Sequence, residues 1–426
     1  MTILEVAVAL DVRRERETSS VVLWPIVGLE QNGHFLHNIN MINVAEKGCV
    51  LGLALNRNGG IPFRIQLKDR LMHLHVVGQT GTGKSTLLGN LALQDAQRGF
   101  GFCLIDPHGD LAEALAKRLP ERAIVWTPAD PTNPYGYNPL TRVPAEYRPL
   151  VASGLIDAFK KQWADAWGVR MEHLFRHALL TLLDQPQADF RDVMPLFLDK
   201  ALRSQMMQQV SDSQVRHFWA AEFDNMNYKN ALDGVAPIAN KLGAFLAHPT
   251  VRQALCHPER PLRFRKIMDE GQVLIINLCK GRLGVDVANV LGGLIVGSIV
   301  NAAFSRQSLQ EGDRRPFMLH VDEFHSFTTG AIADLLPETR KYGLGLTLAH
   351  QHVAQVDAKV FDAILGNVGS LLAFRVGAND APIFQRQLER VTNSDLINLP
   401  NRRAYLRLML DGQRTQAFSV ATSPLP

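Results

Sequence analysis

A glycine-rich segment between an apolar run and a helical pattern is the first feature of this chain that could do chemistry. It follows the pattern G-x-x-x-x-G-K-[ST] and reads Gly78, Gln79, Thr80, Gly81, Thr82, Gly83, Lys84, Ser85. In such a loop, glycines let the backbone N–H groups point at phosphates, the lysine reaches the β- and γ-phosphates, and the hydroxyl ligates Mg²⁺. Residues 71–77 before it predict a strand, and residues 86–94 after it predict a helix whose N-terminus faces the anion. A glycine-rich turn without a nucleotide is the alternative, but the flanks favour a P-loop that binds a nucleoside triphosphate.

Two adjacent carboxylates form the second chemical feature. Asp322 and Glu323 directly follow the apolar run Phe317–Val321, which is the Walker B arrangement. The first carboxylate would support Mg²⁺ through bound water, and the second would polarise the attacking water as general base. An ordinary acidic strand end is the competing interpretation. A glutamate directly after the aspartate argues against a Ras-like GTPase and favours an ATPase of the ASCE type.

Three further polar residues lie near predicted strand ends. Gln351 comes just after the run 344–349 and His350, and we expect it to contact the γ-phosphate and the attacking water, with a solvated strand end as the alternative. Arg340, eleven residues earlier, would stabilise transition-state charge at a neighbouring subunit, or is simply a solvated arginine. Arg375 lies inside the last predicted core strand, where an arginine needs a partner. The sequence leaves open whether that partner is a phosphate or a core carboxylate.

Length and composition exclude several classes of protein. The 426 residues suffice for two or three domains, and 46% hydrophobic with 20% charged residues is typical of a soluble globular protein. The net charge is only +4, and the sequence has no basic tail typical of nucleic-acid binding. Its four widely spaced cysteines favour buried thiols over disulfides or a zinc site. Residues 287–304 are almost wholly apolar but contain Gly, Asn and Ser. Small residues there predict a helix buried in an α/β core, so no integral membrane segment is expected.

Apolar strands that alternate with helices predict an α/β fold with a mostly parallel sheet covered on both faces. The strands are expected at residues 71–77, 100–105, 123–126, 273–278, 317–321, 344–349 and 370–375, with a closing hairpin over 405–420. Residues 1–70 are expected to form a small β-rich N-terminal module. Helical periodicity over residues 147–266 predicts an all-helical insertion that divides the main domain into 71–146 and 267–426.

The order of these motifs resembles that of the HerA–FtsK superfamily of DNA-pumping ATPases, most closely the type IV secretion coupling proteins of the TraG/TraD type. The motifs are the Walker A segment from Gly78 to Thr86, residues 105–110, the helical insertion, residues 321–324 and residues 349–351. The resemblance covers roughly residues 71–420. It implies a RecA-like motor domain with an all-α domain inserted after the third strand, Gln351 as the polar sensor, and Arg340 acting in trans.

The same resemblance implies an ATP- and Mg²⁺-dependent translocase that threads DNA through a homohexameric ring. It also implies a cytoplasmic location, peripheral at the inner membrane, with secretion-channel or relaxosome proteins as partners. Membrane-anchored coupling proteins begin with transmembrane helices, and no such helix is expected here, so docking at a secretion channel stays open. The alternatives are a protein-secretion or pilus-assembly ATPase, a HerA-like motor in DNA processing or defence, and a nucleotide-binding switch.

Contacts with DNA are the least specified part of this interpretation. Lys280 and Arg282 follow the predicted strand 273–278, where loops of a hexamer would face the channel and supply cations to phosphates. Two basic residues beside a glycine are also an ordinary turn. Whether the DNA would be single- or double-stranded is not specified by any motif.

Overall fold

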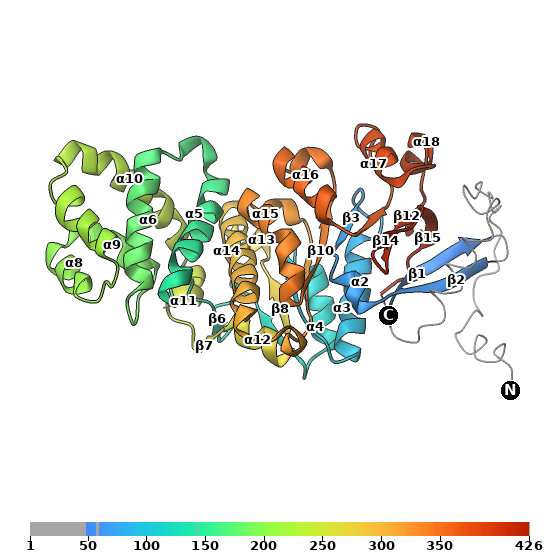
Figure 1. Cartoon of the computed structure of the whole chain (residues 1–426), viewed down its shortest axis with the longest axis horizontal. Coiled ribbons are helices and arrows are strands. Elements are labelled where there is room, and N and C mark those ends of the chain that lie inside the picture. The colour runs from blue at the N-terminus through green and yellow to red at the C-terminus, as the bar shows by residue number, and fades with distance from the viewer. Residues whose placement is uncertain (1–47, 57–58, 142, 426) are drawn as a thin grey trace.

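The described residues, 48–56, 59–141 and 143–425 of the computed structural model, are organised around one sheet of eleven strands (Figure 1). Across the sheet the order is β2-β1-β15-β12-β11-β3-β10-β9-β4-β8-β5. The strands from β11 to β5 are β11 (Ser370–Ala373), β3 (Leu74–Val77), β10 (Leu344–His350), β9 (Phe317–Val321), β4 (Gly101–Asp106), β8 (Val273–Asn277) and β5 (Ala123–Trp126). All neighbours among these strands are parallel. The predicted α/β class with a mostly parallel sheet is therefore confirmed.

The predicted strands agree closely with the observed ones, and one difference has a clear cause. β5 and β9 have the predicted bounds, whereas β3 begins at Leu74 instead of residue 71. The short helix α2 (Leu67–Arg70) ends just before this point, and His73 has a φ of 67°. A left-handed backbone at His73 interrupts extended structure, so the strand starts after it.

Helices cover both faces of the sheet because alternate strand residues point to opposite sides (Figure 1). On β4, Leu104 packs in the cluster that contains α3 (Lys84–Gln97) and α4 (Asp110–Arg118). Its neighbour Ile105 packs in the second cluster, together with residues of α14 (Val285–Phe304), α15 (Gly330–Thr339), α16 (Ala358–Asn367) and α17 (Ala381–Leu388). Both faces of this strand are buried, as expected for an interior strand of a parallel sheet.

Helix α14 accounts for the long apolar stretch in the sequence. Among the described residues, the segment Val285–Ser308 is the one helix long and apolar enough to cross a membrane, and 61% of its apolar window is buried inside the protein. A Cβ at Gly292 would lie 2.2 Å from the Phe327 ring, and one at Gly293 would lie 3.2 Å from Cβ of Ala158. The glycines therefore allow close packing of α14 inside the protein, as the sequence predicted for a core helix.

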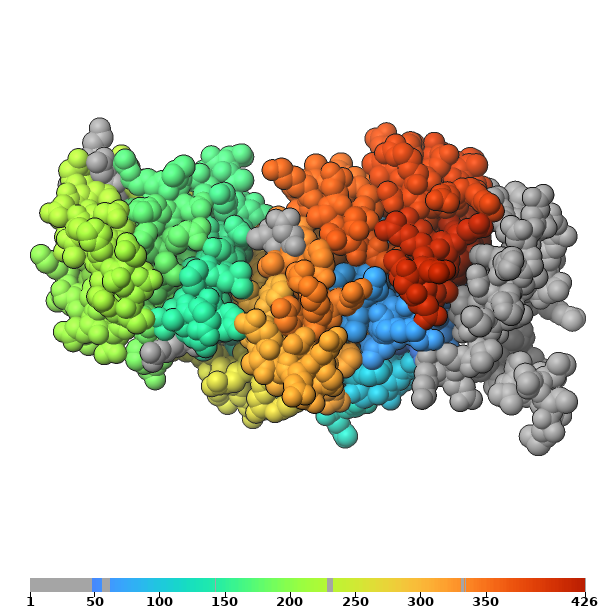
Figure 2. Space-filling view, viewed as in Figure 1, coloured from blue at the N-terminus to red at the C-terminus, as the bar shows by residue number. Residues whose placement is uncertain are grey.

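The chain between β5 and β8 is largely helical, and its residues 148–246 form one end of the molecule (Figures 1 and 2). Its helices are α5 (Arg148–Gln162), α6 (Val169–Leu183), α7 (Val193–Leu198), α8 (Lys200–Met207), α9 (Ser213–His217), α10 (Tyr228–Leu246), α11 (Pro249–Cys256) and α12 (Phe264–Glu270). Two short parallel strands, β6 (Tyr135–Gly136) and β7 (Arg260–Pro261), lie side by side where the chain enters and leaves this segment. The helical insertion thus begins and ends at one place.

Antiparallel strands complete the sheet beyond β11. They are β12 (Arg403–Arg407), β15 (Phe418–Ala421), β1 (Cys49–Asn56) and β2 (Gly59–Ile65). Between β12 and β15, β13 (Met409–Leu410) and β14 (Gln413–Arg414) form a tight hairpin whose turn residues Asp411 and Gly412 both have positive φ. Because β1 pairs with β15, the two N-terminal strands extend the main sheet. Residues 1–47 of the predicted N-terminal module lie outside the described residues, and the division into domains stays a prediction.

Candidate active site

Three neighbouring strands end at the same edge of the sheet and bring the predicted chemical residues together. β10 pairs in parallel with β3 on one side and with β9 on the other. The P-loop follows β3, Gln351 follows β10, and Asp322 and Glu323 follow β9. Ligands of open parallel sheets bind at this carboxyl edge. Residues more than 230 positions apart in sequence thus converge on one site, as the spacing of Ser85 and Asp322 shows.

The P-loop turns tightly between β3 and α3. Gly81 and Gly83 have φ values of 76° and 118°, a region open to glycine at little cost. A Cβ at Gly78 would lie 2.6 Å from Cβ of Phe374, so the loop packs directly on the segment that follows β11. Lys84 is buried beneath the loop and donates hydrogen bonds to the carbonyl oxygens of Gly78 (2.7 Å) and Gln79 (3.3 Å). An amino group held here, at the start of a 14-residue helix, fits a phosphate.

Ser85 and Asp322 join the P-loop to the end of β9. The Ser85 hydroxyl donates to Oδ2 of Asp322 at 2.7 Å. Burial raises the pKa of Asp322 to about 6; the Ser85 hydrogen bond opposes this rise, and the charges of Glu323 and Asp106 add to it. A hydroxyl and a buried carboxylate beside two more carboxylates form a site of excess negative charge. Mg²⁺ prefers such oxygen ligands, so these residues fit the metal that the sequence predicted.

Glu323 is held in an unusual conformation beside Gln351. Its φ of 48° and ψ of 47° are left-handed, which is uncommon for a residue with a side chain and is often found at functional sites. Nε2 of Gln351 donates to Oε1 of Glu323 at 2.6 Å, and the Thr80 hydroxyl donates to Oε1 of Gln351 at 2.9 Å. His325 Nδ1 lies 3.5 Å from the other carboxylate oxygen of Glu323. Gln351 therefore bridges the P-loop and the predicted general base, whereas His325 is a neighbour of that base that the sequence analysis missed.

Arg340 lies at the amino end of β10, at the opposite ends of the strands from the P-loop. It starts a short 3-10 turn (Arg340–Tyr342) just before β10, it is exposed, and its guanidinium contacts the Met72 sulfur. β10 has seven residues, so at about 3.3 Å per residue Arg340 is roughly 20 Å from the P-loop edge of its own chain. An arginine side chain does not reach that far. A role of Arg340 at the nucleotide of another subunit stays a prediction.

Arg375 lies beside the P-loop, two residues after β11. Its Nε donates to Oε1 of Gln79 at 3.2 Å, and its two terminal nitrogens donate to the Leu399 carbonyl and to Oδ1 of Asn401, each at 3.1 Å. All three acceptors are neutral oxygens. Of the two possibilities that the sequence left open, the structure therefore favours an approach to the nucleotide site within the same chain.

The two residues predicted to contact DNA lie on the four-residue helix α13 (Lys280–Leu283) after β8. Nζ of Lys280 donates to the Ser326 hydroxyl at 3.0 Å and lies 5.5 Å from the centre of the Phe327 ring. Arg282 donates to the Ala129 carbonyl at 2.9 Å. Contact of these residues with DNA stays a prediction. No sequence pattern predicted that Lys280 approaches the turn after Glu323. The two residues come close only because of the order of the strands in the sheet.

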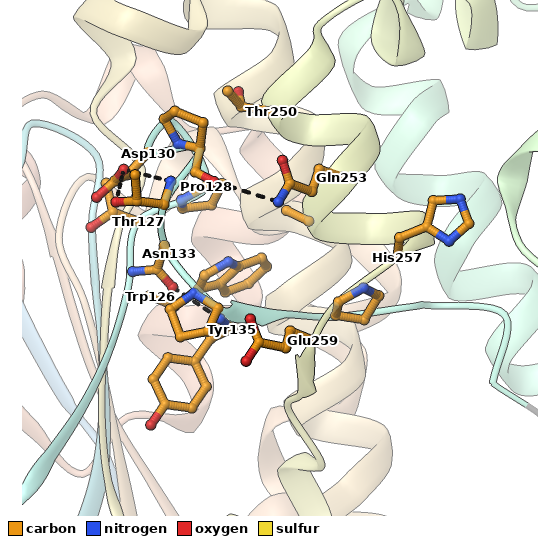
Figure 3. Close-up of a pocket in the computed structure, with 15 residues that line it drawn as sticks. Trp126, Thr127, Pro128, Asp130, Asn133, Tyr135, Thr250, Gln253, His257 and Glu259 are labelled. Carbon is orange, nitrogen blue, oxygen red and sulfur yellow. Dashed lines mark hydrogen bonds between the residues drawn. The ribbon is translucent and has the colours of Figure 1, made fainter.

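A separate hollow of about 90 Å³ lies at the last strand of the sheet, between the loop after β5 and α11 (Figure 3). Four prolines line it together with Trp126, Tyr135, Asp130 and Glu259, among other residues of 126–135 and 250–259. None of these residues belongs to the P-loop or to the end of β9. The chemistry described above is therefore at the ends of β3, β9 and β10 and not in this hollow.

Comparisons with known proteins agree with this geometry. The sequence profile of the family described as "Helicase HerA, central domain" matches residues 49–291. Among solved structures, the bacterial conjugative coupling protein TrwBdeltaN70 superposes with a TM-score of 0.66 at 18% identity, over 92% of each chain. VirB4 of Thermoanaerobacter pseudethanolicus superposes with a TM-score of 0.64 at 14% identity, over 90% of this chain and 98% of that one. TrwB has also been solved with ADP and Mg²⁺, at 19% identity and a TM-score of 0.64, over 91% of this chain and 92% of that one. These identities show the fold alone. A search of curated proteins found no match.

Proposed function

This chain belongs to the family of the helicase HerA central domain, and from that membership we propose that it is an ATP-driven motor that translocates DNA. The observation that carries the proposal is the bridge from Thr80 through Gln351 to Glu323. It connects the loop that would hold the γ-phosphate to the carboxylate that would activate water. A nucleotide-binding switch needs no built-in base oriented in this way, so the bridge supports hydrolysis.

Each residue at the strand ends has its own role in ATP hydrolysis. The P-loop N–H groups and Lys84 bind the triphosphate of ATP. Ser85 and Asp322 would hold Mg²⁺, which when bound neutralises phosphate charge. Glu323 accepts the proton of the attacking water, and Gln351 keeps the Glu323 carboxylate oriented for that transfer. Arg375 fixes Gln79 of the P-loop through its hydrogen bond to the Gln79 side chain.

Assembly into a homohexameric ring is the second part of the proposal. Arg340 is exposed and lies at the edge of the sheet away from its own P-loop. An arginine that stabilises transition-state charge must approach the γ-phosphate, so Arg340 could do so only in a neighbouring subunit. A ring in which each subunit supplies Arg340 to the next has six equivalent composite sites.

DNA is the proposed substrate, because the matched family is that of a helicase and the superposed TrwB is a conjugative coupling protein. A motor of this kind would act in the cytoplasm, where it could meet secretion-channel or relaxosome proteins. A protein-secretion or pilus-assembly ATPase is the second candidate, because the modest net charge of +4 does not require a nucleic-acid partner. The two candidates differ in what stimulates hydrolysis.

ATPase assays with and without nucleic acid test the proposal. We expect Mg²⁺-dependent hydrolysis that rises several-fold with DNA, together with a hexamer by native mass spectrometry in the presence of ATP. Because contacts would be made to phosphates, stimulation should weaken steeply with salt. Parallel reactions with single- and double-stranded DNA of equal length identify the substrate form. Hydrolysis that neither DNA form changes at any ionic strength would overturn the DNA motor and favour a polypeptide substrate.

A further inference from the structure

The predicted general base Glu323 begins a turn of residues 323–328 that is held by its own backbone hydrogen bonds. We call this segment the catalytic turn. Ser326 N–H donates to the Glu323 carbonyl at 3.0 Å, and Thr328 N–H donates to the Phe324 carbonyl at 2.9 Å. The Phe324 side chain is fully buried. Glu323 starts this turn with a left-handed backbone and accepts one of its hydrogen bonds, so the turn helps to set the position of the Glu323 carboxylate.

Two lysines from distant parts of the chain hold the catalytic turn. Nζ of Lys280, on α13, donates to the Ser326 hydroxyl at 3.0 Å and lies over the Phe327 ring. Nζ of Lys161, at the end of α5 in the helical insertion, donates to the Thr328 carbonyl. We propose that Lys280 and Lys161 are positioning residues of the ATPase, and that through Lys161 the helical insertion acts on the catalytic turn.

The environment of Lys280 fits this role better than an exposed loop would. Its side chain is partly buried, and burial lowers its pKa, while the carboxylates of Glu323 and Asp322 oppose that change. Both carboxylates thus favour the charged form of the Lys280 amino group. Its main-chain N–H donates to the Pro107 carbonyl at 2.9 Å, which anchors α13 beside the end of β4. An anchored cation with a hydrogen bond and a ring contact is suited to fix a turn.

The inference rests on the proposed ATPase activity, and substitutions in the full-length chain separate the two. Lys280→Gln removes the cation, and Ser326→Ala removes its acceptor. Without DNA, we expect each variant to lower kcat for ATP roughly tenfold or more, since small misplacements of catalytic groups cost that much. KM for ATP should stay within about twofold, because the P-loop is untouched. The double variant should be no slower than the slower single variant, because both remove the same contact.

Lys161→Gln tests the part played by the helical insertion, and Lys160→Gln is its matched control. Lys160 is the adjacent exposed lysine and pairs with Glu172 in the same helical segment. We expect a lower kcat for Lys161→Gln and unchanged hydrolysis for Lys160→Gln. Equal rates in these two variants would show that the helical insertion does not act on the catalytic turn.

Three further outcomes would contradict either the positioning role of Lys280 or the proposed ATPase. A Lys280→Gln protein with normal kcat but no response to DNA would make Lys280 a DNA contact and overturn its positioning role. A rise in KM equal to the loss of kcat would show damage to nucleotide binding and would also overturn it. A wild-type protein without any hydrolysis would instead refute the proposed ATPase itself.

Discussion

Gln351 donates a hydrogen bond to the Glu323 carboxylate at 2.6 Å while it accepts one from the Thr80 hydroxyl at 2.9 Å. The side-chain amide has one donor group and one acceptor oxygen, and both are used in this bridge. A change in the P-loop on loss of the γ-phosphate would therefore reach the general base through a single side chain. Gln351 lies at the end of β10, between the strands that carry its two partners.

Gln351→Ala should separate nucleotide binding from hydrolysis. The substitution leaves the P-loop intact but frees the Glu323 carboxylate from its hydrogen bond. We expect kcat to fall roughly tenfold to a hundredfold, in the range typical of lost positioning and acid–base groups, with little change in ATP affinity. Single-turnover hydrolysis and binding of a fluorescent ATP analogue measure the two quantities. Normal single-turnover hydrolysis would show that the bridge is not used in catalysis.

Lys84→Ala should abolish ATP hydrolysis in a folded protein. The amino group is buried under the P-loop and donates to two carbonyl oxygens of that loop, so its charge serves the phosphates more than the core. Loss of charge stabilisation at a phosphoryl group should cost several kcal/mol of transition-state binding. Circular dichroism checks the fold, and phosphate release measures the rate. Retention of more than about a tenth of wild-type turnover would contradict the P-loop mechanism, since that corresponds to only about 1.4 kcal/mol.

Glu323→Gln should bind ATP without hydrolysing it. The amide fills the same space and keeps one oxygen for the Gln351 hydrogen bond, but it does not accept the proton of the attacking water. We expect ATP to remain unchanged on the purified protein after long incubation with Mg²⁺. Analysis of bound nucleotide by chromatography tests this. If the variant fails to bind ATP, Glu323 has a structural role instead.

Features that depend on short sequence patterns could be predicted from the sequence, whereas contacts between residues far apart in the chain could not. The P-loop and the Asp322-Glu323 pair are short patterns that the sequence shows at strand ends, and the parallel sheet brings them together. The pairing of β1 with β15 was not predictable in the same way, because it joins residues near the two ends of the chain. The contact of Lys161 with Thr328 spans 167 positions and depends on how the helical insertion packs. Such contacts follow from tertiary packing and have no short-range pattern.

Arg340 should act only between subunits. Arg340→Ala and Glu323→Gln proteins should each be inactive alone, since every interface then lacks one catalytic group. Mixed oligomers contain some interfaces with an intact Glu323 and an intact Arg340, so they should regain part of the wild-type rate. The measurement is ATPase activity against mixing ratio, with subunit exchange verified by native mass spectrometry. No recovery in verified mixed oligomers would place Arg340 outside the catalytic site.

Asp322 should make the stability of the nucleotide-free protein depend on pH. Burial raises its pKa from an ordinary 3.8 to about 6. The folded protein therefore binds more protons than the unfolded chain between these values, and the free energy of unfolding falls as pH rises through that window. The difference of roughly two pKa units corresponds to at most about 3 kcal/mol. Asp322→Asn does not titrate and should lack this contribution.

The comparison of the two proteins isolates this one carboxyl. The stability of Asp322→Asn relative to wild type should increase from pH 4 to pH 8, when unfolding is measured in EDTA. Burial lowers the pKa of His73 to about 4 and that of His75 to about 3, but both histidines titrate in both proteins and cancel in the difference. With Mg²⁺ and ATP at pH 8, only wild type should be strongly stabilised, because the asparagine lacks the charge that supports the metal. A stability difference that is the same at every pH would mean that burial does not raise the pKa of Asp322.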